Sequence, residues 1–239
     1  MTEQFNKKVI GDCTLYNADC VDVLSLISTV DAVVTDPPYG INQDKGFSGS
    51  GGFGGSGGKP IHRKKYFGVW DNVRPTKKIF DLILSYKKNC IIFGGNYFTD
   101  ILPVGKHWLV WDKKNTMPTF SDCELAWTNI NKKSVKLLTY EYNGVLGKRE
   151  KRVHPTQKPY EVMRWCIEKL PKPNSIIFDP FMGSGTTGVA CAKLGKKFIG
   201  VELDPNYFQI ACQRIEKAYQ EPDLFVSPPT EIKQEVMEL

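Results

Sequence analysis

The sequence lacks several patterns from which a function is most easily inferred. Its seven cysteines are scattered, with no CxxC pair and no spacing typical of zinc ligands. An odd, dispersed set of this kind is typical of reduced thiols in a cytosolic compartment. No signal peptide and no apolar run long enough to cross a membrane is recognisable. We therefore expect a cytoplasmic protein with no membrane partner.

Charge is unevenly distributed along the chain. The net charge is +6 at pH 7, but residues 221–239 hold five acids against one lysine, a net of −4 that leaves +10 on the preceding body. A basic body suits a polyanion such as nucleic acid, although many unrelated enzymes are also basic. With 239 residues, 41% of them apolar, the chain can bury a sizeable core. We expect one domain over residues 1–220 and an acidic tail over 221–239.

A rigid corner follows an early apolar run. Residues 32–34 predict a strand of a parallel sheet, and Pro37 and Pro38 must end it because neither can donate to a β-ladder. Open α/β sheets bind ligands at such carboxyl ends. Asp36 and the Pro37 carbonyl offer acceptors beside the flat ring of Tyr39, which suits a planar group that bears an amino substituent. The alternative is a proline-stiffened turn with a surface tyrosine.

A second apolar strand runs into a glycine-rich turn far down the chain. Residues 175–188 read Ser-Ile-Ile-Phe-Asp-Pro-Phe-Met-Gly-Ser-Gly-Thr-Thr-Gly, and a helix is predicted to follow. Gly183 and Gly185 can adopt positive φ and let a ligand lie against the backbone. The free N–H groups at the helix start favour an anionic ligand group, such as a carboxylate. No Gly-Lys-Ser/Thr follows, so the turn is not a Walker phosphate loop; alone, it is often only a tight connection.

Acidic residues follow two further predicted elements. Glu202 ends a predicted strand at 198–202, 17 residues after Gly185, where dinucleotide-type folds place an acid on ribose hydroxyls. The alternative is an ordinary charged residue at a strand end. Asp19 precedes a predicted helix at about 21–28, and its simplest role is that of an N-cap. Apolar spacing predicts further helices at about 76–86, 160–170 and 207–219.

These blocks together resemble a known family. Asp-Pro-Pro-Tyr at 36–39, Phe-Asp-Pro-Phe-Met-Gly-Ser-Gly-Thr-Thr at 178–187 and Gly-Val-Glu-Leu-Asp at 200–204 are similar to the DNA amino-methyltransferases that use S-adenosylmethionine. The catalytic motif precedes the cofactor motif, which is the permuted order of that family's β group. Further blocks of the group match at 94–97, 108–113 and 154–159. The resemblance extends from about residue 11 to 219.

The resemblance implies a fold and a set of site residues. The fold is an α/β, Rossmann-like methyltransferase domain, with a mostly parallel sheet of about seven strands, one antiparallel edge strand, expected at 135–140, and helices on both faces. The catalytic motif is Asp36, Pro37, Pro38 and Tyr39, and no metal is required. S-adenosylmethionine is the implied cofactor, and its contacts are carried onto Asp19, Cys20, Lys158, Asp179, Pro180, Phe181, Gly183, Ser184, Gly185, Thr186, Thr187, Glu202 and Leu203.

The implied reaction is methyl transfer to the N6 amine of an adenine flipped out of double-stranded DNA. Adenine is preferred because, in the family, Asp in the first motif position usually accompanies adenine and Ser accompanies cytosine N4. The alternatives are a cytosine-N4 enzyme, an RNA or small-molecule methyltransferase, or a binding protein that has lost activity. The family also allows a homodimer and a cognate restriction endonuclease, in the cytoplasm of a prokaryotic cell or a phage-infected host.

Two segments are candidates for DNA contacts. The Gly/Ser-rich stretch at about 43–66 predicts a flexible coil, either a tolerated insertion or a lid that closes over DNA. The stretch at 132–153 is basic and occupies the place of the target-recognition segment, which is short here. Phosphate contacts are expected from Lys59, Arg63, Lys64, Lys65, Lys148, Arg149, Lys151 and Arg152.

Three further residues have alternative interpretations. Asn96 and Tyr97 either touch the flipped base or the cofactor, or simply begin a helix. His154 invites a general-base role, but it lies in His-Pro-Thr-Gln-Lys-Pro, a turn-forming stretch that leads into a predicted helix. We favour a structural role for His154.

Overall fold

The structure, a computed structural model, describes residues 5–27, 29–41, 73–86, 88–114, 121–141, 153–154, 156–171 and 175–221. The Gly/Ser-rich stretch at 43–66 lies outside these residues, as do all eight predicted DNA contacts and nearly all of the acidic tail. Among the described residues, no helix is long and apolar enough to cross a bilayer.

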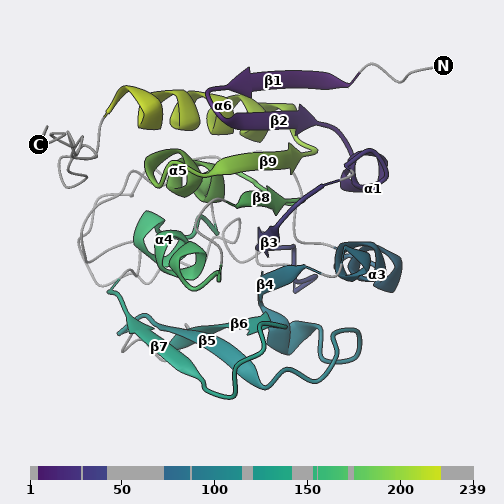
Figure 1. The fold of residues 1–239 in the computed structure, drawn as a ribbon, viewed down its shortest axis with the longest axis vertical. Helices are drawn as coiled ribbons and strands as arrows, with labels where there is room; N and C mark the ends of the chain where they lie inside the picture. Colours follow the sequence, from purple (N-terminus) through teal and green to yellow (C-terminus); the bar gives the residue numbers. More distant parts are fainter. Residues whose placement is uncertain are drawn as a thin grey trace, which may run out of the picture.

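One nine-stranded sheet runs through the described residues, in the order β1-β2-β9-β8-β3-β4-β6-β5-β7 (Figure 1). Its strands are β1 Asn6–Ile10, β2 Cys13–Asn17, β3 Ala32–Thr35, β4 Asn89–Phe93, β5 His107–Asp112, β6 Cys123–Thr128, β7 Lys136–Thr139, β8 Ile176–Asp179 and β9 Lys197–Glu202. β2, β9, β8, β3 and β4 pair in parallel, as β5 and β7 also do. The sheet is therefore mostly parallel, which confirms the predicted α/β class.

The antiparallel strands are not where we expected them. The stretch at 135–140 supplies β7, which pairs in parallel with β5, so its prediction as an antiparallel edge is wrong. The strands that run the other way are β1, at one edge, and β6, between β4 and β5. β5 ends at Asp112 and β6 begins at Cys123, a gap too short for a helical crossover, so β6 turns back. The described sheet thus has nine strands rather than about seven, because the entry hairpin β1–β2 also joins it.

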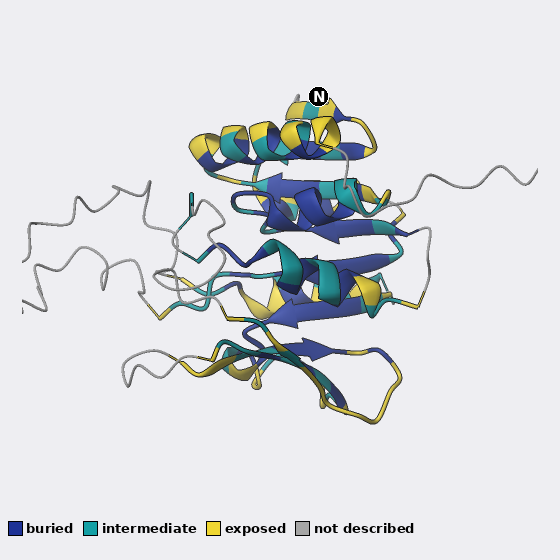
Figure 2. Cartoon of the chain, turned by 90° about the vertical axis from the view of Figure 1, so that its left-hand side faces the viewer, coloured by how far each residue is buried: buried dark blue, intermediate teal, exposed yellow. Residues whose placement is uncertain are grey.

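Helices cover both faces of the sheet, as predicted. α4 Tyr160–Glu168, α5 Thr186–Lys193 and α6 Pro205–Gln220 lie on one face, and α1 Cys20–Leu24 and α3 Lys77–Ser85 lie on the other (Figure 1). A short 3-10 helix, η1 Gly95–Tyr97, follows β4. Figure 2 shows that the central strands are buried, while the side of α6 that faces solvent is exposed.

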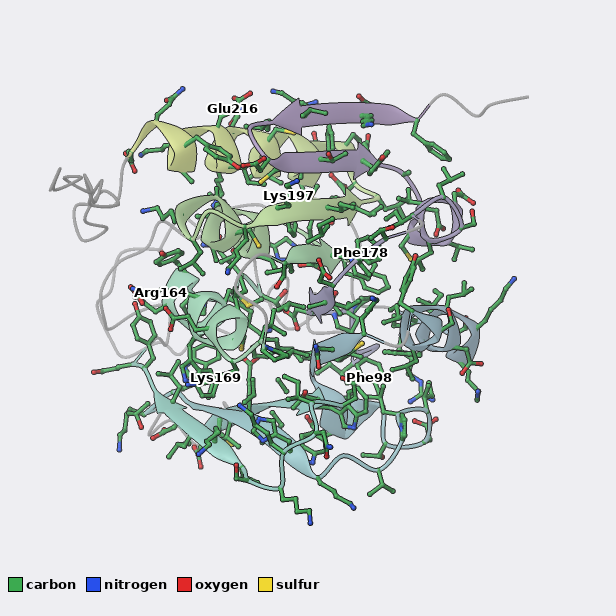
Figure 3. The ribbon with its side chains drawn as sticks, in the orientation of Figure 1. Phe98, Arg164, Lys169, Phe178, Lys197 and Glu216 are labelled. Carbon is green, nitrogen blue, oxygen red and sulfur yellow. The ribbon has the colours of Figure 1, made fainter. Side chains whose placement is uncertain are left out.

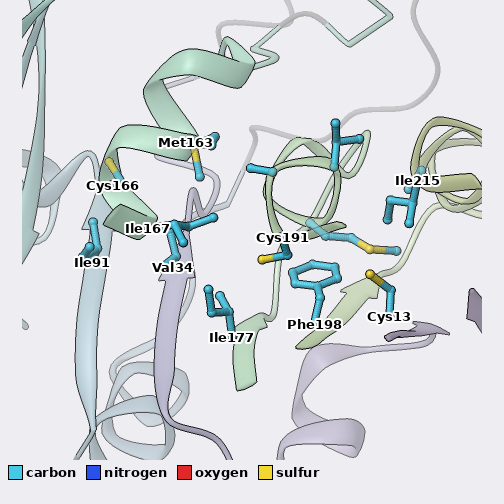
Figure 4. Packing of buried hydrophobic residues seen from close by; sticks show 14 of the residues in the cluster. Cys13, Val34, Ile91, Met163, Cys166, Ile167, Ile177, Cys191, Phe198 and Ile215 are labelled. Carbon is cyan, nitrogen blue, oxygen red and sulfur yellow. The ribbon is translucent and has the colours of Figure 1, made fainter. Parts of the chain in front are cut away.

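Alternate side chains of the central strands enter two separate cores. Val33 and Phe178 belong to the core beneath α1 and α3, together with Phe98 (Figure 3). Val34 and Ile177 belong to the core beneath α4, α5 and α6 (Figure 4). Because successive side chains of a strand point to opposite faces, only a continuous apolar run can fill both cores. This explains why Ala32, Val33 and Val34 are all buried; Thr35, the polar last residue of β3, is buried with its hydroxyl bonded to Asp179.

Candidate active site

Four parallel strands deliver carboxylates to the same edge of the sheet. Asp36 follows β3, Asp179 ends β8, Glu202 ends β9 and Asp19 follows β2. Since the carboxyl ends of parallel strands lie together, the Asp-Pro-Pro-Tyr corner meets the glycine-rich turn here.

A cavity of about 750 Å³ opens at this edge and is lined by both motifs. A smaller cavity adjoins it, and Asp36, Phe181 and Gly183 line both. The larger one lies within the size range of sites for small molecules and cofactors. Of the residues predicted to bind the cofactor, all except Gly185 line one cavity or the other. The structure thus brings the two predicted motifs into one crevice.

Gly185 has a different role. It lies at the N-cap of α5 with a φ of 78°, and a Cβ added there would come within 2.8 Å of the Ala211 Cβ. It therefore allows α5 to pack closely against α6. Gly183 also has a positive φ, of 53°, but no atom lies within 4 Å of the position that its Cβ would occupy. Of the two glycines, only Gly183 leaves open space, and it lines the cavity.

Asp179 holds the start of the glycine-rich turn in place through three hydrogen bonds. Its Oδ1 accepts hydrogen bonds from the Thr35 hydroxyl at 2.6 Å and the Phe181 amide at 3.1 Å, and its Oδ2 accepts one from the Thr187 hydroxyl at 2.6 Å. Burial raises the pKa of its carboxyl to about 6, although these three donors oppose the shift. Asp179 thus connects β3, β8 and α5.

Glu202 holds the same turn through hydrogen bonds from two backbone amides. Its Oε2 accepts from the Gly183 amide at 2.9 Å and its Oε1 from the Asp204 amide at 2.8 Å. Burial raises its pKa to about 7, while the two amide donors lower it. Each carboxylate oxygen keeps a second acceptor site, so Glu202 can still bind a hydroxyl in the cavity.

Asp19 is the predicted N-cap and also lines the larger cavity. Its Oδ1 accepts from the Val21 amide at 2.8 Å, which makes it the N-cap of α1. It also lines the larger cavity, beside Cys20. Burial raises the pKa of the Cys20 thiol to about 12, so this side chain is uncharged at neutral pH.

Both carboxylate oxygens of Asp36 accept hydrogen bonds from other side chains of the protein. The Tyr39 hydroxyl donates to Oδ1 at 2.6 Å, and the Lys158 ammonium donates to Oδ2 at 2.5 Å. The Tyr39 ring stacks on Tyr97, with ring centroids 4.8 Å apart and planes 19° apart. Gly94 makes room for this ring, because a Cβ there would lie 2.2 Å from a Tyr39 ring carbon. Tyr97 is therefore the neighbour of Tyr39 in addition to being the last residue of η1.

Two residues at this site, Glu124 and Lys113, were missed by sequence reasoning. Lys158 also forms an ion pair with Glu124 at 3.0 Å, and the other oxygen of Glu124 pairs with Lys113 at 2.6 Å. Glu124 reaches the site because β6 runs antiparallel, so that the start of this strand lies among the carboxyl ends of its neighbours. The short gap between β5 and β6 was the signal that could have revealed it.

The pKa values of the cluster follow from burial and pairing. Burial raises the pKa of Asp36, an effect that Lys158 opposes and Glu124 reinforces. Burial alone would lower the pKa of Lys158, but Asp36 and Glu124 outweigh it and raise that pKa. Burial would likewise raise the pKa of Glu124, but Lys158 and Lys113 outweigh it and lower that pKa. Burial raises the pKa of Tyr39 well above its ordinary value. Lys158 and Tyr39 therefore stay protonated at neutral pH.

His154 lines both cavities. Its ring packs edge-on against Tyr207, with centroids 4.3 Å apart, and its Nδ1 lies 3.3 Å from the Thr156 amide nitrogen, which donates to it. These contacts fix the turn that precedes α4.

The predicted DNA contacts lie outside the described residues; they are Lys59, Arg63, Lys64, Lys65, Lys148, Arg149, Lys151 and Arg152. Of the recognition segment at 132–153, the structure describes the first ten residues and Val153. Lys132, Lys133 and Lys136 are exposed at the start of β7. Since β7 is parallel to β5, this start lies at the edge opposite the cavity.

Comparison with known proteins identifies the family. A family model described as "DNA methylase" matches residues 58–213. The type II methyltransferase M2.LlaDCHI of Lactococcus lactis subsp. cremoris is 30% identical over 262 residues, which cover 91% of this chain and 93% of that protein. The type II methyltransferase M.HinfI of Haemophilus influenzae is 24% identical, over 90% of this chain and 73% of its own length.

Solved structures agree with this relationship. The crystal structure of an M1.HpyAVI–SAM complex aligns with a TM-score of 0.56 and 27% identity, covering 85% of this chain and 98% of the other. PvuII DNA methyltransferase (cytosine-N4-specific) aligns with a TM-score of 0.55 over 91% of this chain and 95% of the other; at 15% identity it shows the fold alone. The chain therefore belongs to the DNA methylase family, the S-adenosylmethionine-dependent DNA methyltransferases, with the motif order of the β group.

Proposed function

We propose that this DNA methyltransferase transfers a methyl group from S-adenosylmethionine to the exocyclic N6 of a flipped adenine in a specific DNA sequence. The observation that carries the proposal is the shared cavity. Asp36, which can accept from an amine, and Gly183, at the cofactor-type turn, line the same space. A methyl donor on one side and an amine on the other would meet there.

The residues around the cavity fit S-adenosylmethionine. Glu202 offers carboxylate oxygens for ribose hydroxyls, and Asp19 with Cys20 lies at the same wall for the adenine. Phe181 and Leu203 add apolar surface to that wall. In the smaller cavity the first residues of α5 suit the anionic end of the methionine group. When bound, the cofactor supplies a methyl group already activated on a sulfonium, so the protein's task is placement.

The remaining residues of the predicted cofactor set contribute in different ways. Pro180, Ser184, Thr186 and Thr187 line the cavities and are proposed as contacts. Asp179 and Gly185 are proposed to act through the shape of the turn.

Asp36 and the Pro37 carbonyl are the proposed acceptors for the target amine. Two acceptors would hold the amine hydrogens and turn the nitrogen lone pair toward the methyl group. Acceptors aimed at a nitrogen that gains positive charge also stabilise the transition state more than the ground state. Lys158 stays a cation, so it is not the group that removes the proton. The amine must share or displace the contacts that Tyr39 and Lys158 make with Asp36.

Tyr39 and Pro38 complete the proposed base pocket. A base inside a duplex is out of reach, so it must flip out and be held, and aromatic side chains stack well on flipped bases. In the structure the Tyr39 ring already stacks on Tyr97. The base would meet this pair of rings at the mouth of the larger cavity.

The choice of adenine rests on Asp36 in the first position of the motif, where the family's cytosine-N4 members usually carry Ser. We also propose action in the cytoplasm of a prokaryotic cell or a phage-infected host. We also propose a cognate restriction endonuclease, which is supported by the type II names of the relatives. A homodimer is proposed from the family resemblance alone.

The test is nucleoside analysis of the methylated product. The full-length protein is incubated with isotope-labelled S-adenosylmethionine and, in parallel, with duplex DNA, single-stranded DNA and RNA. The nucleic acid is then digested and its nucleosides are separated by chromatography and mass spectrometry. We expect labelled N6-methyladenine from duplex DNA. Labelled N4-methylcytosine alone would overturn the choice of base, and transfer to RNA alone would overturn the choice of substrate.

A further inference from the structure

A row of alternating charges leads from the sheet to Asp36. Lys113 pairs with Glu124 at 2.6 Å, Glu124 with Lys158 at 3.0 Å, and Lys158 with Asp36 at 2.5 Å. Its members come from four places in the chain: the end of β5, the start of β6, the turn before α4 and the corner after β3. Four segments thus join two cations and two anions through three successive ion pairs.

The row is largely removed from solvent. The Lys158 side chain is 5% exposed, and the other three side chains are about one fifth exposed. A buried ammonium costs several kcal/mol unless it is closely paired. Lys158 meets this requirement with two carboxylates, one on each side. It also lies over the rings of Phe93 and Tyr39, at 5.2 and 5.7 Å from their centroids.

Lys158 presents a difficulty for methyl transfer. It occupies an oxygen of Asp36 that the target amine needs, and its positive charge opposes the charge that the amine gains. A second anion beside Lys158 offsets part of its positive charge and offers it a second partner when the target amine takes the Asp36 oxygen. Glu124 is that anion, and Lys113 holds its other oxygen so that it does not turn away.

We propose that Glu124, held by Lys113, is a positioning residue for methyl transfer, which shares the Lys158 ammonium with Asp36 and so lets the Asp36 carboxylate exchange its contact with Lys158 for one with the target amine. The inference rests on the proposed function. It assigns a role in that reaction to a residue outside every motif that the sequence revealed.

The charged and titratable groups that face Asp36 set the expected pH effect. They are Lys158, Glu124, Tyr39 and Asp179. Burial raises the pKa of Asp36, Lys158 lowers it, and Glu124 raises it further. Without the charge of Glu124, Lys158 would pair with Asp36 alone. The pKa of Asp36 would then fall, and the acid limb of the rate profile would move to lower pH.

The experiment compares Glu124→Gln with wild type in the full chain. Single-turnover methyl transfer is measured at saturating S-adenosylmethionine and duplex DNA across the acid limb. We expect the rate at neutral pH to fall on the order of 10- to 100-fold, as misplacement of a reacting group typically causes. We also expect the acid limb to shift to lower pH, with calorimetric affinity for S-adenosylmethionine largely kept.

Two further variants separate positioning from structure. Glu124→Asp keeps the charge, so its acid limb should stay at the wild-type pH even if the rate falls. Glu161→Gln makes the same chemical change on the surface of α4, where Glu161 is 44% exposed and pairs with Arg164 at 3.7 Å. It should match wild type in rate and in profile.

Two results would overturn the inference. One is a Glu124→Gln enzyme with the wild-type rate. The other is a slower enzyme whose acid limb does not move and whose melting temperature falls as it does in Glu124→Asp. A wild-type protein that transfers no methyl group to DNA would instead refute the proposed function, and the inference with it.

Discussion

The Thr35 hydroxyl donates a 2.6 Å hydrogen bond to Oδ1 of Asp179, across 144 positions of the chain. Thr35 immediately precedes Asp36, and Asp179 begins the glycine-rich turn. One buried contact therefore fixes the proposed amine acceptor relative to the proposed cofactor turn. The distance and angle between the methyl donor and the target amine matter more for the reaction than the acid strength of any side chain, because the methyl group arrives already activated.

Thr35→Val should weaken the fold through this contact. Valine keeps the shape but leaves the buried Asp179 with one donor fewer, and loss of a hydrogen bond to a charged group costs about 1.5–3 kcal/mol. Thr139→Val is the matched control, because the exposed Thr139 donates a longer, solvent-exposed hydrogen bond, of 3.2 Å, to Asp112. Its free energy of unfolding should change by less than about 0.5 kcal/mol. Urea denaturation of both variants checks this; equal losses would contradict it.

Gly183→Ala and Gly195→Ala form a second matched pair. Both glycines have positive φ, 53° and 61°, and neither would bring a Cβ within 4 Å of another atom. Each variant should lose about 1–2 kcal/mol of stability from backbone strain. Only Gly183 lines the cavities, so only Gly183→Ala should weaken calorimetric binding of S-adenosylmethionine. Equal affinities in the two variants would remove Gly183 from the cofactor site.

Binding of S-adenosylmethionine should strengthen as pH rises through about 7. The pKa of Glu202 is raised to about 7 by burial, and hydroxyl donors prefer its ionised form. Binding therefore releases a proton below that pH, and the affinity should change by up to about tenfold per pH unit before it levels off. Glu202→Gln should bind more weakly and without this slope. Glu216→Gln, which removes a carboxylate that is 42% exposed and paired with Lys8 away from the cavity lining, should keep the slope. Calorimetry from pH 6.5 to 8.5 measures all three proteins.

The sequence was most informative where the backbone itself is constrained. Consecutive prolines after a buried strand located Asp36, and glycines before a helix located the turn at Gly183. Parallel strands bring such ends together whatever the rest of the fold does, so their meeting could be predicted. The N-cap role of Asp19 could be predicted for a similar reason, since it depends on residues next to it in the chain.

Long-range contacts of charged side chains could not be predicted in the same way. The residues of β6 do not themselves show that this strand runs antiparallel. The short gap after β5 is the one sequence signal for that direction, and only that direction brings Glu124 to Lys158. Lys158 was predicted to contact the cofactor, but its position between two carboxylates depends on three separate segments. The predicted direction of β7 was wrong for a similar reason. The chain reverses between β5 and β6 and again between β6 and β7, so β7 is parallel to β5.

The most direct test of the account is tritium transfer from labelled S-adenosylmethionine to duplex DNA by Asp36→Ala, with calorimetric cofactor binding measured on the same protein. The account predicts that transfer is abolished while binding remains largely intact, because Asp36 holds the amine and other residues hold the methyl donor. Transfer near the wild-type rate by this variant would contradict it.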